Sequence, residues 1–299
     1  MVGEPTDANN PNLKLSPILK DRLNNTFIAV SFYHQNLLRN TNIISFLIKI
    51  LKWDVVYHKY MSVNMTKALI QSIYQILGYC CWKNEQNKQY LVKYLKDTFI
   101  QHFDREVDLG VTAFLNILFY ENDSILDNDD QLKKIIDKIF RKISKIQNTS
   151  SEYAVPFLLH LLGNIIYSKK KNIKPYQNSI LSSFFELKNQ TFIDIHPAIL
   201  KEYNDQIINA TPQMLFGNAK GILIPDQVCH FLSYFDLLTV CCAGKNSFSE
   251  NISQNLVSIK TIENVLSTPN VHPIIKSGLL HFFFEVYLET ERDNFSFYQ

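Results

Sequence analysis

The stretch "QLKKIIDKIFRKISKIQ", residues 131–147, decides the fold class, because its apolar and charged residues occupy different faces of a helix. Its apolar residues recur at steps of three and four, the period of an α-helix: Leu132, Ile135, Ile136, Ile139, Phe140, Ile143 and Ile146. Its cations fall largely away from that stripe: Lys133, Lys134, Lys138, Arg141, Lys142 and Lys145. We therefore expect an amphipathic helix with one buried face and one basic outer face.

The same period returns along most of the chain. It predicts further helices over residues 42–51, 65–80, 86–103, 108–120, 153–167, 175–187, 197–209, 225–242, 259–266 and 273–290. Four prolines lie near predicted helix starts, where a missing N–H costs nothing: Pro175, Pro197, Pro225 and Pro273. Only 8 glycines and 10 prolines leave little turn chemistry for a many-stranded sheet, and no βαβ alternation is visible.

Helices in unbroken succession, often paired within windows of about 40 residues, are typical of repeat proteins. We therefore predict an all-α fold, a degenerate armadillo/HEAT-like α-solenoid of stacked helix pairs; a compact helical domain without repeats is the alternative. The polar residues 1–15 are expected to form a disordered head. No linker rich in Pro, Gly or Ser divides the remainder, so residues 16–299 are expected to form a single domain.

Composition excludes several classes of function. The 30 Lys and Arg residues nearly balance the 28 Asp and Glu residues, so net charge gives no reason to expect specific nucleic-acid binding. No run approaches the roughly 18 apolar residues of a membrane span, and a cytoplasmic protein is expected. The five cysteines are odd in number and lack metal-ligand spacing, which argues against both a disulfide framework and a zinc site. They are Cys80, Cys81, Cys229, Cys241 and Cys242.

Motifs of catalysis are also missing, since the chain has neither His-Glu-x-x-His nor Gly-x-Ser-x-Gly. We expect no enzyme, no cofactor and no metal, although a helical hydrolase or transferase with dispersed residues is a further hypothesis. One acidic cluster could attract calcium, but it lacks the EF-hand pattern. Carboxylates at a helix N-terminus complement the helix dipole and explain the cluster without an ion. Its members are Glu121, Asp123, Asp127, Asp129 and Asp130.

The stretch "LLTVCCAGKNSFSE", residues 237–250, admits three interpretations: a nucleotide loop, a thiol site or a turn. A Walker A loop is excluded, because Thr239 takes the place of its first glycine and Asn246 that of its hydroxyl residue. Cys241 and Cys242 end an apolar run, and such cysteines are expected in the core.

A turn between two helices is the interpretation that remains. Gly244 is expected to adopt the left-handed conformation just after a helix. Lys245 would then lie near the exposed carbonyls of that helix, and Glu250 would lie at the start of the next turn.

The longer stretch "LLTVCCAGKNSFSENISQNL" resembles the cytosolic armadillo solenoid of inositol trisphosphate receptors, a region shared with ryanodine receptors. The resemblance rests on Leu237, Leu238, Cys241, Gly244, Lys245, Asn246, Phe248 and Glu250. It continues with Leu256, an Ile/Val-rich helix at 259–266, Pro273, Lys276, Tyr287, Glu289, Thr290 and Glu291, and so covers about residues 228–294 only.

This resemblance implies a non-enzymatic scaffold or protein-interaction module, part of the cytosolic solenoid of an intracellular calcium-release channel, without the ligand core or the pore. The expected partners are protein subunits of a channel or of another large assembly. The motif turn supplies the candidate partner contacts: Gly244, Lys245, Asn246, Phe248, Glu250, Tyr287, Thr290 and Glu291.

A second hypothesis places the chain in a cytoskeletal or ciliary, microtubule-associated assembly. There the basic face of residues 132–147 would meet an acidic polymer such as tubulin. An ordinary solvated helix face is the alternative explanation of the same cations: Lys133, Lys134, Lys138, Arg141, Lys142 and Lys145.

Overall fold

The computed structural model describes residues 32–52, 62–105, 107–120, 122, 129–147, 155–166, 174–186, 202–203, 205, 212–215, 219–222 and 226–289. The chain divides into two compact units, which we call the N-terminal unit (Asn24–Tyr176) and the C-terminal unit (from Gln177 onward). The two are treated separately below. The disordered head at 1–15 lies outside the described residues, and the single domain at 16–299 stays a prediction.

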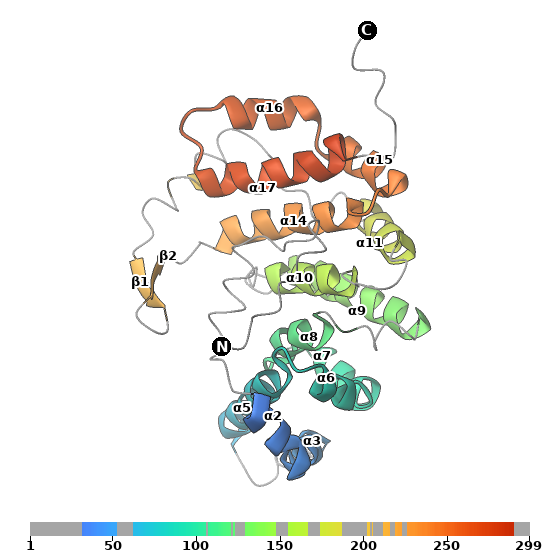
Figure 1. Ribbon diagram of the computed structural model, residues 1–299, viewed down its shortest axis with the longest axis vertical. Coiled ribbons are helices and arrows are strands. Elements are labelled where there is room, and N and C mark those ends of the chain that lie inside the picture. The colour runs from blue at the N-terminus through green and yellow to red at the C-terminus, as the bar shows by residue number, and fades with distance from the viewer. Residues whose placement is uncertain are drawn as a thin grey trace, which may run out of the picture. The chain divides into compact units, whose positions relative to one another are not determined.

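Helices dominate both units, which confirms the all-α prediction (Figure 1). The N-terminal unit contains α2 (Phe32–Asn40), α3 (Ile43–Lys52), α5 (Val63–Cys81), α6 (Glu85–Val92), η1 (Leu95–Phe99), α7 (Ile100–Phe103), α8 (Val111–Phe119), α9 (Asp129–Gln147) and α10 (Val155–Ile166). Helix α11 (Lys174–Glu186) crosses the boundary. The C-terminal unit adds α14 (Asp226–Cys242), α15 (Ser247–Leu256), α16 (Ile259–Ser267), α17 (Pro273–Phe283) and η4 (Phe284–Leu288).

Two short strands are the exception to the all-helical expectation. Strand β1 (Pro212–Leu215) pairs antiparallel with β2 (Ala219–Ile222), with Pro212 opposite Ile222. The sequence between the two strands contains Gly217-Asn218, a dipeptide typical of hairpins. The pair is too small to change the fold class.

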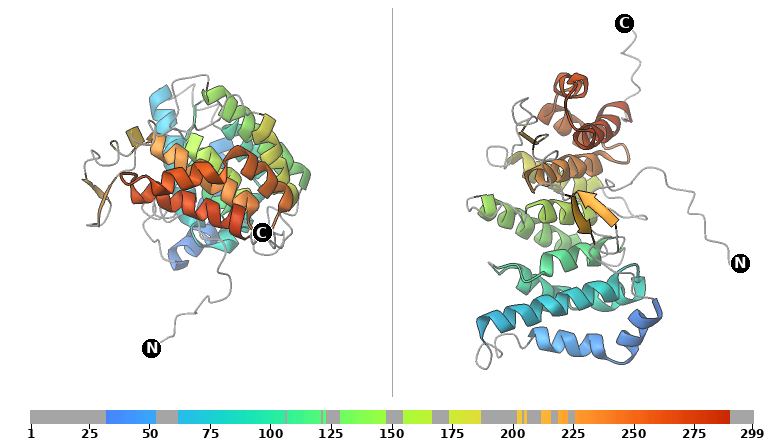
Figure 2. Two further views of the ribbon diagram at one scale, coloured as in Figure 1. Left: turned by 90° about the horizontal axis from the view of Figure 1, so that it is seen from above. Right: turned by 90° about the vertical axis from the view of Figure 1, so that its left-hand side faces the viewer.

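The N-terminal unit is a stack in which each helix packs on a near neighbour in the chain. Helix α5 packs on α2, α3 and α8, and α8 in turn packs on α10, which packs on α9 (Figure 2). The rings of Tyr74, Phe99 and Phe114 form the centre of this core, with centroids 4.8–6.2 Å apart. This neighbour-on-neighbour packing is the kind that stacked helix pairs were expected to show.

The C-terminal unit is built around α14, which packs on α15 and α17, while α16 lies beside α17. Phe231, Phe235 and Phe282 are fully buried at this contact. Helix α17 approaches α14 so closely that a Cβ added at Gly278 would lie 3.0 Å from Leu232 Cδ2. As predicted, Pro273 is the first residue of α17, and His272 caps that helix by accepting the N–H of Ile274.

Several helix boundaries differ from the expected ones. The continuous helix predicted over 86–103 is divided into α6, the π-helix η1 and α7. Helix α8 begins only at Val111, because Gly110 before it has a φ of 85°. The helix predicted over 273–290 ends as α17 at Phe283 and continues as the π-helix η4. Helices α2 and α15 were not predicted, and the helix expected at 197–209 lies almost wholly outside the described residues.

Candidate interaction surfaces

The turn after α14 has the predicted backbone. Gly244 has a φ of 78°, the left-handed conformation expected just after a helix, and Lys245 follows with a φ of 60°. Helix α15 then begins at Ser247, with Glu250 in its first turn. Gly244, Lys245 and Phe248 are exposed, so this part of the motif is available to a partner.

Asn246, by contrast, lies inside the C-terminal unit. Its Nδ2 donates to Gln177 Oε1 (2.9 Å) and to Asn178 Oδ1 (2.8 Å), and both of these residues are on α11. Gln177 Nε2 in turn donates to the carbonyl oxygens of Val240 (3.0 Å) and Ala243 (2.9 Å) at the end of α14. We call Gln177, Asn178 and Asn246 the C-terminal latch, because they tie the turn to a helix distant in sequence.

The other motif residues are divided between surface and core. Glu250 is 3% exposed, so its side chain is not presented at the surface. Tyr287, in η4, is half-buried, and its hydroxyl donates to the carbonyl oxygen of Val257 (2.6 Å). Thr290 and Glu291 lie outside the described residues. Among the described motif residues, the exposed ones therefore lie chiefly at the turn itself.

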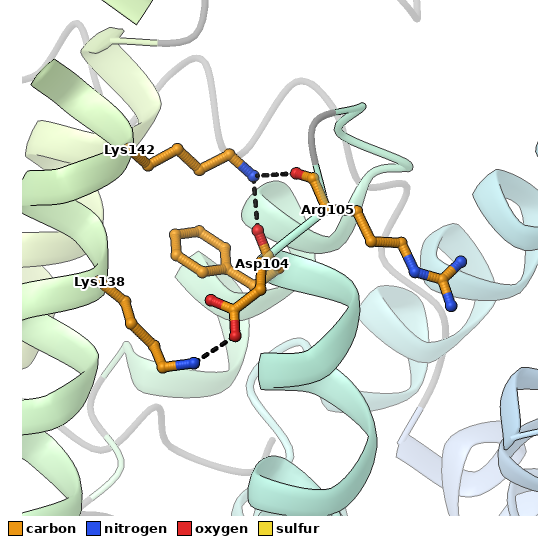
Figure 3. A network of polar contacts seen from close by, with 5 residues as sticks. Asp104, Arg105, Lys138 and Lys142 are labelled. Carbon is orange, nitrogen blue, oxygen red and sulfur yellow. Dashed lines mark hydrogen bonds and ion pairs between the residues drawn. The ribbon is translucent and has the colours of Figure 1, made fainter. Parts of the chain in front are cut away.

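The predicted stripe of α9 is buried except at its end, where Ile146 is half-buried. The other members are each at most 6% exposed: Leu132, Ile135, Ile136, Ile139, Phe140 and Ile143. Its basic face, however, is not uniformly free. Lys142 Nζ donates to the carbonyl oxygens of Phe103 (2.6 Å) and Arg105 (3.2 Å), and Lys138 pairs with the Asp104 carboxylate (Figure 3). The remaining four cations are exposed: Lys133, Lys134, Arg141 and Lys145.

Lys142 serves the fold rather than a solvated surface. Its ammonium lies 4.5 Å from the centre of the Phe103 ring and binds carbonyls at the C-terminal end of α7, where a cation is favoured. Burial lowers its pKa, and the nearby carboxylates of Asp108 and Asp104 act in the opposite direction. The basic face available to an acidic polymer is therefore smaller than the sequence suggests.

A buried polar cluster between α8 and α10 was not anticipated from the sequence. Asn116 Oδ1 lies 3.0 Å from His160 Nδ1 and accepts from Asn164 Nδ2 (2.9 Å). Asn116 Nδ2 donates to the carbonyl oxygens of Thr112 and Phe157. Burial lowers the pKa of His160 to about 4, so the ring is neutral at pH 7. The cluster cross-links two helices, and no sequence motif links its three members.

All five cysteines are buried, as expected for Cys241 and Cys242. Burial raises the pKa of the Cys80 thiol to about 11 and that of Cys242 to about 12. Since the thiolate is the reactive form, these groups are poor nucleophiles at neutral pH. The thiol-site interpretation of the motif gains no support from this environment.

The acidic cluster considered for calcium lies mostly outside the described residues, which include only the backbone of Asp129 and Asp130 at the start of α9. Over the described ranges, no three His, Cys, Asp or Glu side chains converge as a metal site would require. None of the helices that the structure describes combines the length and apolar character needed to cross a membrane.

Comparison with known families gives one match. The family model of the RIH domain, which is named for ryanodine and inositol trisphosphate receptors, matches residues 17–195, more than half of the chain. The chain belongs to the RIH-domain family. No curated protein matches the sequence.

The RIH match confirms the suspected domain but covers a different part of the chain. Residues 17–195 include every helix from α2 to α11. The residues that carried the resemblance, about 228–294, lie beyond its end, where α14, α15, α16 and α17 are found. The sequence resemblance therefore pointed to the correct family from a region that the RIH match does not reach.

Proposed function

We propose that this RIH-domain protein is a non-enzymatic helical scaffold, which binds protein partners in the cytosolic assembly of an intracellular calcium-release channel or of a related complex. The observation that carries the proposal is the RIH match over residues 17–195. In this proposal the protein acts in the cytoplasm, and its helices provide binding surface rather than a reaction centre.

The first three helices that the structure describes in the N-terminal unit, α2, α3 and α5, supply a candidate contact. They expose large apolar side chains, each 39–70% accessible: Phe32, Tyr33, Leu37, Ile43, Phe46, Val63, Met65 and Ile76. We call these residues the α2–α3–α5 surface. Helices α2, α3 and α5 pack against one another, so the exposed residues belong to one part of the unit.

The described residues of α2, α3 and α5 carry charge of one sign. Residues 32–52 and 62–84 contain no Asp or Glu, while Lys49, Lys52 and Lys83 are exposed. Exposed apolar groups favour burial against a partner, and one-sided charge favours a partner of opposite charge. The chemistry fits an amphipathic helix that carries acidic residues beside its apolar stripe.

The test is purification of the intact protein from its native cell in mild detergent, followed by mass spectrometry. We expect a multi-pass calcium channel to accompany it. The variant Phe46→Glu should abolish this recovery, because it replaces one of the most exposed apolar side chains of the α2–α3–α5 surface (61%) by a charge. Phe157→Glu, on α10, is the matched control, since Phe157 is also an exposed phenylalanine (45%) of the same unit.

Equal recovery of the channel with both variants would remove the α2–α3–α5 surface from the proposal but leave the scaffold role intact. Recovery of tubulin or axonemal subunits instead, with sedimentation that salt weakens, would contradict the channel assignment. That result would direct attention to the exposed cations of α9: Lys133, Lys134, Arg141 and Lys145.

A further inference from the structure

The N-terminal unit contains a latch of its own at the turn after α5. Gln35, on α2, donates from Nε2 to the carbonyl oxygens of Tyr79 (2.8 Å) and Trp82 (3.0 Å). Asn84, the fully buried N-cap of α6, donates from Nδ2 to Gln35 Oε1 (3.0 Å) and to Asn36 Oδ1 (3.2 Å). We call Gln35, Asn36 and Asn84 the N-terminal latch.

This latch repeats the C-terminal latch bond for bond. In each unit a buried glutamine holds the carbonyls of the residues just before and just after a Cys-Cys pair. In each unit an N-cap asparagine donates to that glutamine and to the asparagine next to it in sequence. Four hydrogen bonds thus recur in two separate parts of the chain, with the same Gln and Asn side-chain atoms and with carbonyls at the same positions around the Cys-Cys pair. Asn84 Oδ1 also accepts the N–H of Asn87, a capping bond that Asn246 does not make.

The backbone of the two turns agrees as well. Lys83, just before the first N-cap asparagine, has a φ of 55°, and Lys245, just before the second, has a φ of 60°. The asparagines have φ, ψ values of −119°, 92° (Asn84) and −105°, 91° (Asn246). Left-handed backbone is uncommon for residues other than glycine, so its recurrence at equivalent lysines is a specific agreement.

The helix before each Cys-Cys pair buries side chains at the same steps along the chain. In α5 these are Ile70, Ile73, Tyr74 and Leu77; in α14 they are Phe231, Tyr234, Phe235 and Leu238. Tyr74 and Phe235 occupy equivalent positions in these two series, and the ring of each contacts a phenylalanine of a later helix. The ring centroids of Tyr74 and Phe114 are 5.5 Å apart, and those of Phe235 and Phe282 are 5.3 Å apart.

The order of elements is also shared. If the continuous η1 and α7 are counted as one segment, three described helical segments follow each turn, and the third packs back on the helix before the turn: α8 on α5, and α17 on α14. Among the elements that the structure describes, the copies differ between the glutamine helix and the Cys-Cys helix, where the first copy has α3 and the second has β1 and β2. The turn between the Cys-Cys pair and the N-cap asparagine is one residue longer in the second copy, where Gly244 is the additional residue.

We propose that the chain contains two copies of one helical module, residues 32–119 and 174–283, each closed by its own Gln–Asn latch. The latch residues are positioning residues: the glutamine amide donates to carbonyls that the end of the preceding helix leaves without helical partners, and the N-cap asparagine holds that glutamine in place by donating to its Oε1. The inference extends the repeat beyond residue 195, where the RIH match ends. It also explains why two non-overlapping regions both point to one family.

Hydrogen exchange of the full-length protein, read by mass spectrometry, tests this directly. Gln35→Glu replaces the donor amide by a carboxylate that faces two carbonyl oxygens, and Gln177→Glu does the same in the second copy. We expect exchange to rise about 10- to 100-fold at residues 79–87 in the first variant and at residues 240–249 in the second. Gln71→Glu, at an exposed glutamine of α5, should leave both turns unchanged.

A graft tests whether the two turns are interchangeable, and it covers the case in which a glutamate variant fails to fold. Residues 243–246 replace residues 82–84, so that the asparagine is kept and one residue is added. This protein should keep wild-type protection at the first turn, whereas the same graft with alanine as its final residue should lose it. Equal loss in both grafts, or a glutamate effect in only one copy, would overturn the proposal of a shared module.

Discussion

His160 should make the N-terminal unit sensitive to mild acid. Its Nδ1 lies 3.0 Å from Asn116 Oδ1, and its Nε2 is buried with no hydrogen-bond partner among the described residues. A second proton would therefore add a charge and an N–H group at a buried position where the described residues offer no acceptor. For this reason burial lowers the pKa of the ring from 6.5 to about 4.

The sign and the size of the effect follow from these two pKa values. As the pH falls through 6.5, the unfolded chain takes up a proton at His160 and the folded unit does not, so the free energy of unfolding decreases. The loss continues until the pH reaches about 4. One pKa unit corresponds to about 1.4 kcal/mol, so the loss between pH 7 and pH 5 is about 2 kcal/mol.

Urea unfolding at pH 7 and at pH 5, followed by circular dichroism, measures this loss. The variant His160→Asn cannot titrate, but its amide can still donate to Asn116 Oδ1. It should be less stable at pH 7, because a smaller side chain leaves a cavity. Its further loss on going to pH 5 should be about 2 kcal/mol smaller than that of the wild type.

Other titrating groups cancel in this comparison, because they are common to both proteins. His34→Asn, at an exposed histidine of α2, should behave as the wild type does. The reasoning is refuted if His160→Asn and the wild type lose equal stability, or if the imidazole signals of His160 in an NMR titration change near pH 6.5.

Three further predictions concern single side chains. Lys142→Met removes two charge-assisted hydrogen bonds to the end of α7 and should cost about 2 kcal/mol in urea unfolding, against less than about 0.5 kcal/mol for the exposed Lys134→Met. Burial, with a smaller contribution from the neighbouring Glu289, raises the pKa of Glu285 to about 7, so the free energy of unfolding falls as the pH rises from 4.5 through 7. Glu285→Gln should therefore add about 1–2 kcal/mol to the free energy of unfolding at pH 8 and less at pH 5. A gain in Tm that is larger at pH 8 than at pH 5 would show this. Iodoacetamide should leave Cys80 and Cys242 unmodified in the folded protein at pH 7.5 and label both after unfolding, which peptide mass spectrometry would detect.

Features that depend on short-range periodicity were predictable. The stripe of α9 and the end of α14 at Cys242 follow from residues within a few positions of one another. The turn at Gly244 was also predictable, because the residue that ends the helix and the conformation it needs are local properties. Helix α15 was missed because its sequence is largely polar, and the buried contacts of its N-cap are made with another helix.

Features that depend on distant partners were not predictable. Asn246 was grouped with the surface contacts, but Gln177, 69 positions earlier, supplies its buried hydrogen-bond partner. Likewise, the cations of α9 look equivalent in sequence, and only the fold brings Lys142 to the carbonyls of Phe103 and Arg105. The π-helix η1 was read as ordinary helix, since Leu95 and Phe99 are four positions apart and both are buried in either geometry.

The two π-helices among the described residues, η1 and η4, have a consequence for how this chain can vary in length. An inserted residue rotates all later side chains of an α-helix by about 100°, which would turn a buried face toward solvent. A π-turn accommodates one additional residue, as the hydrogen bonds from Phe99 N–H to Tyr94 O and from Glu289 N–H to Phe284 O illustrate. Relatives should therefore differ by single-residue gaps at Leu95–Phe99 and Phe284–Leu288, while α5 and α14 keep a constant length.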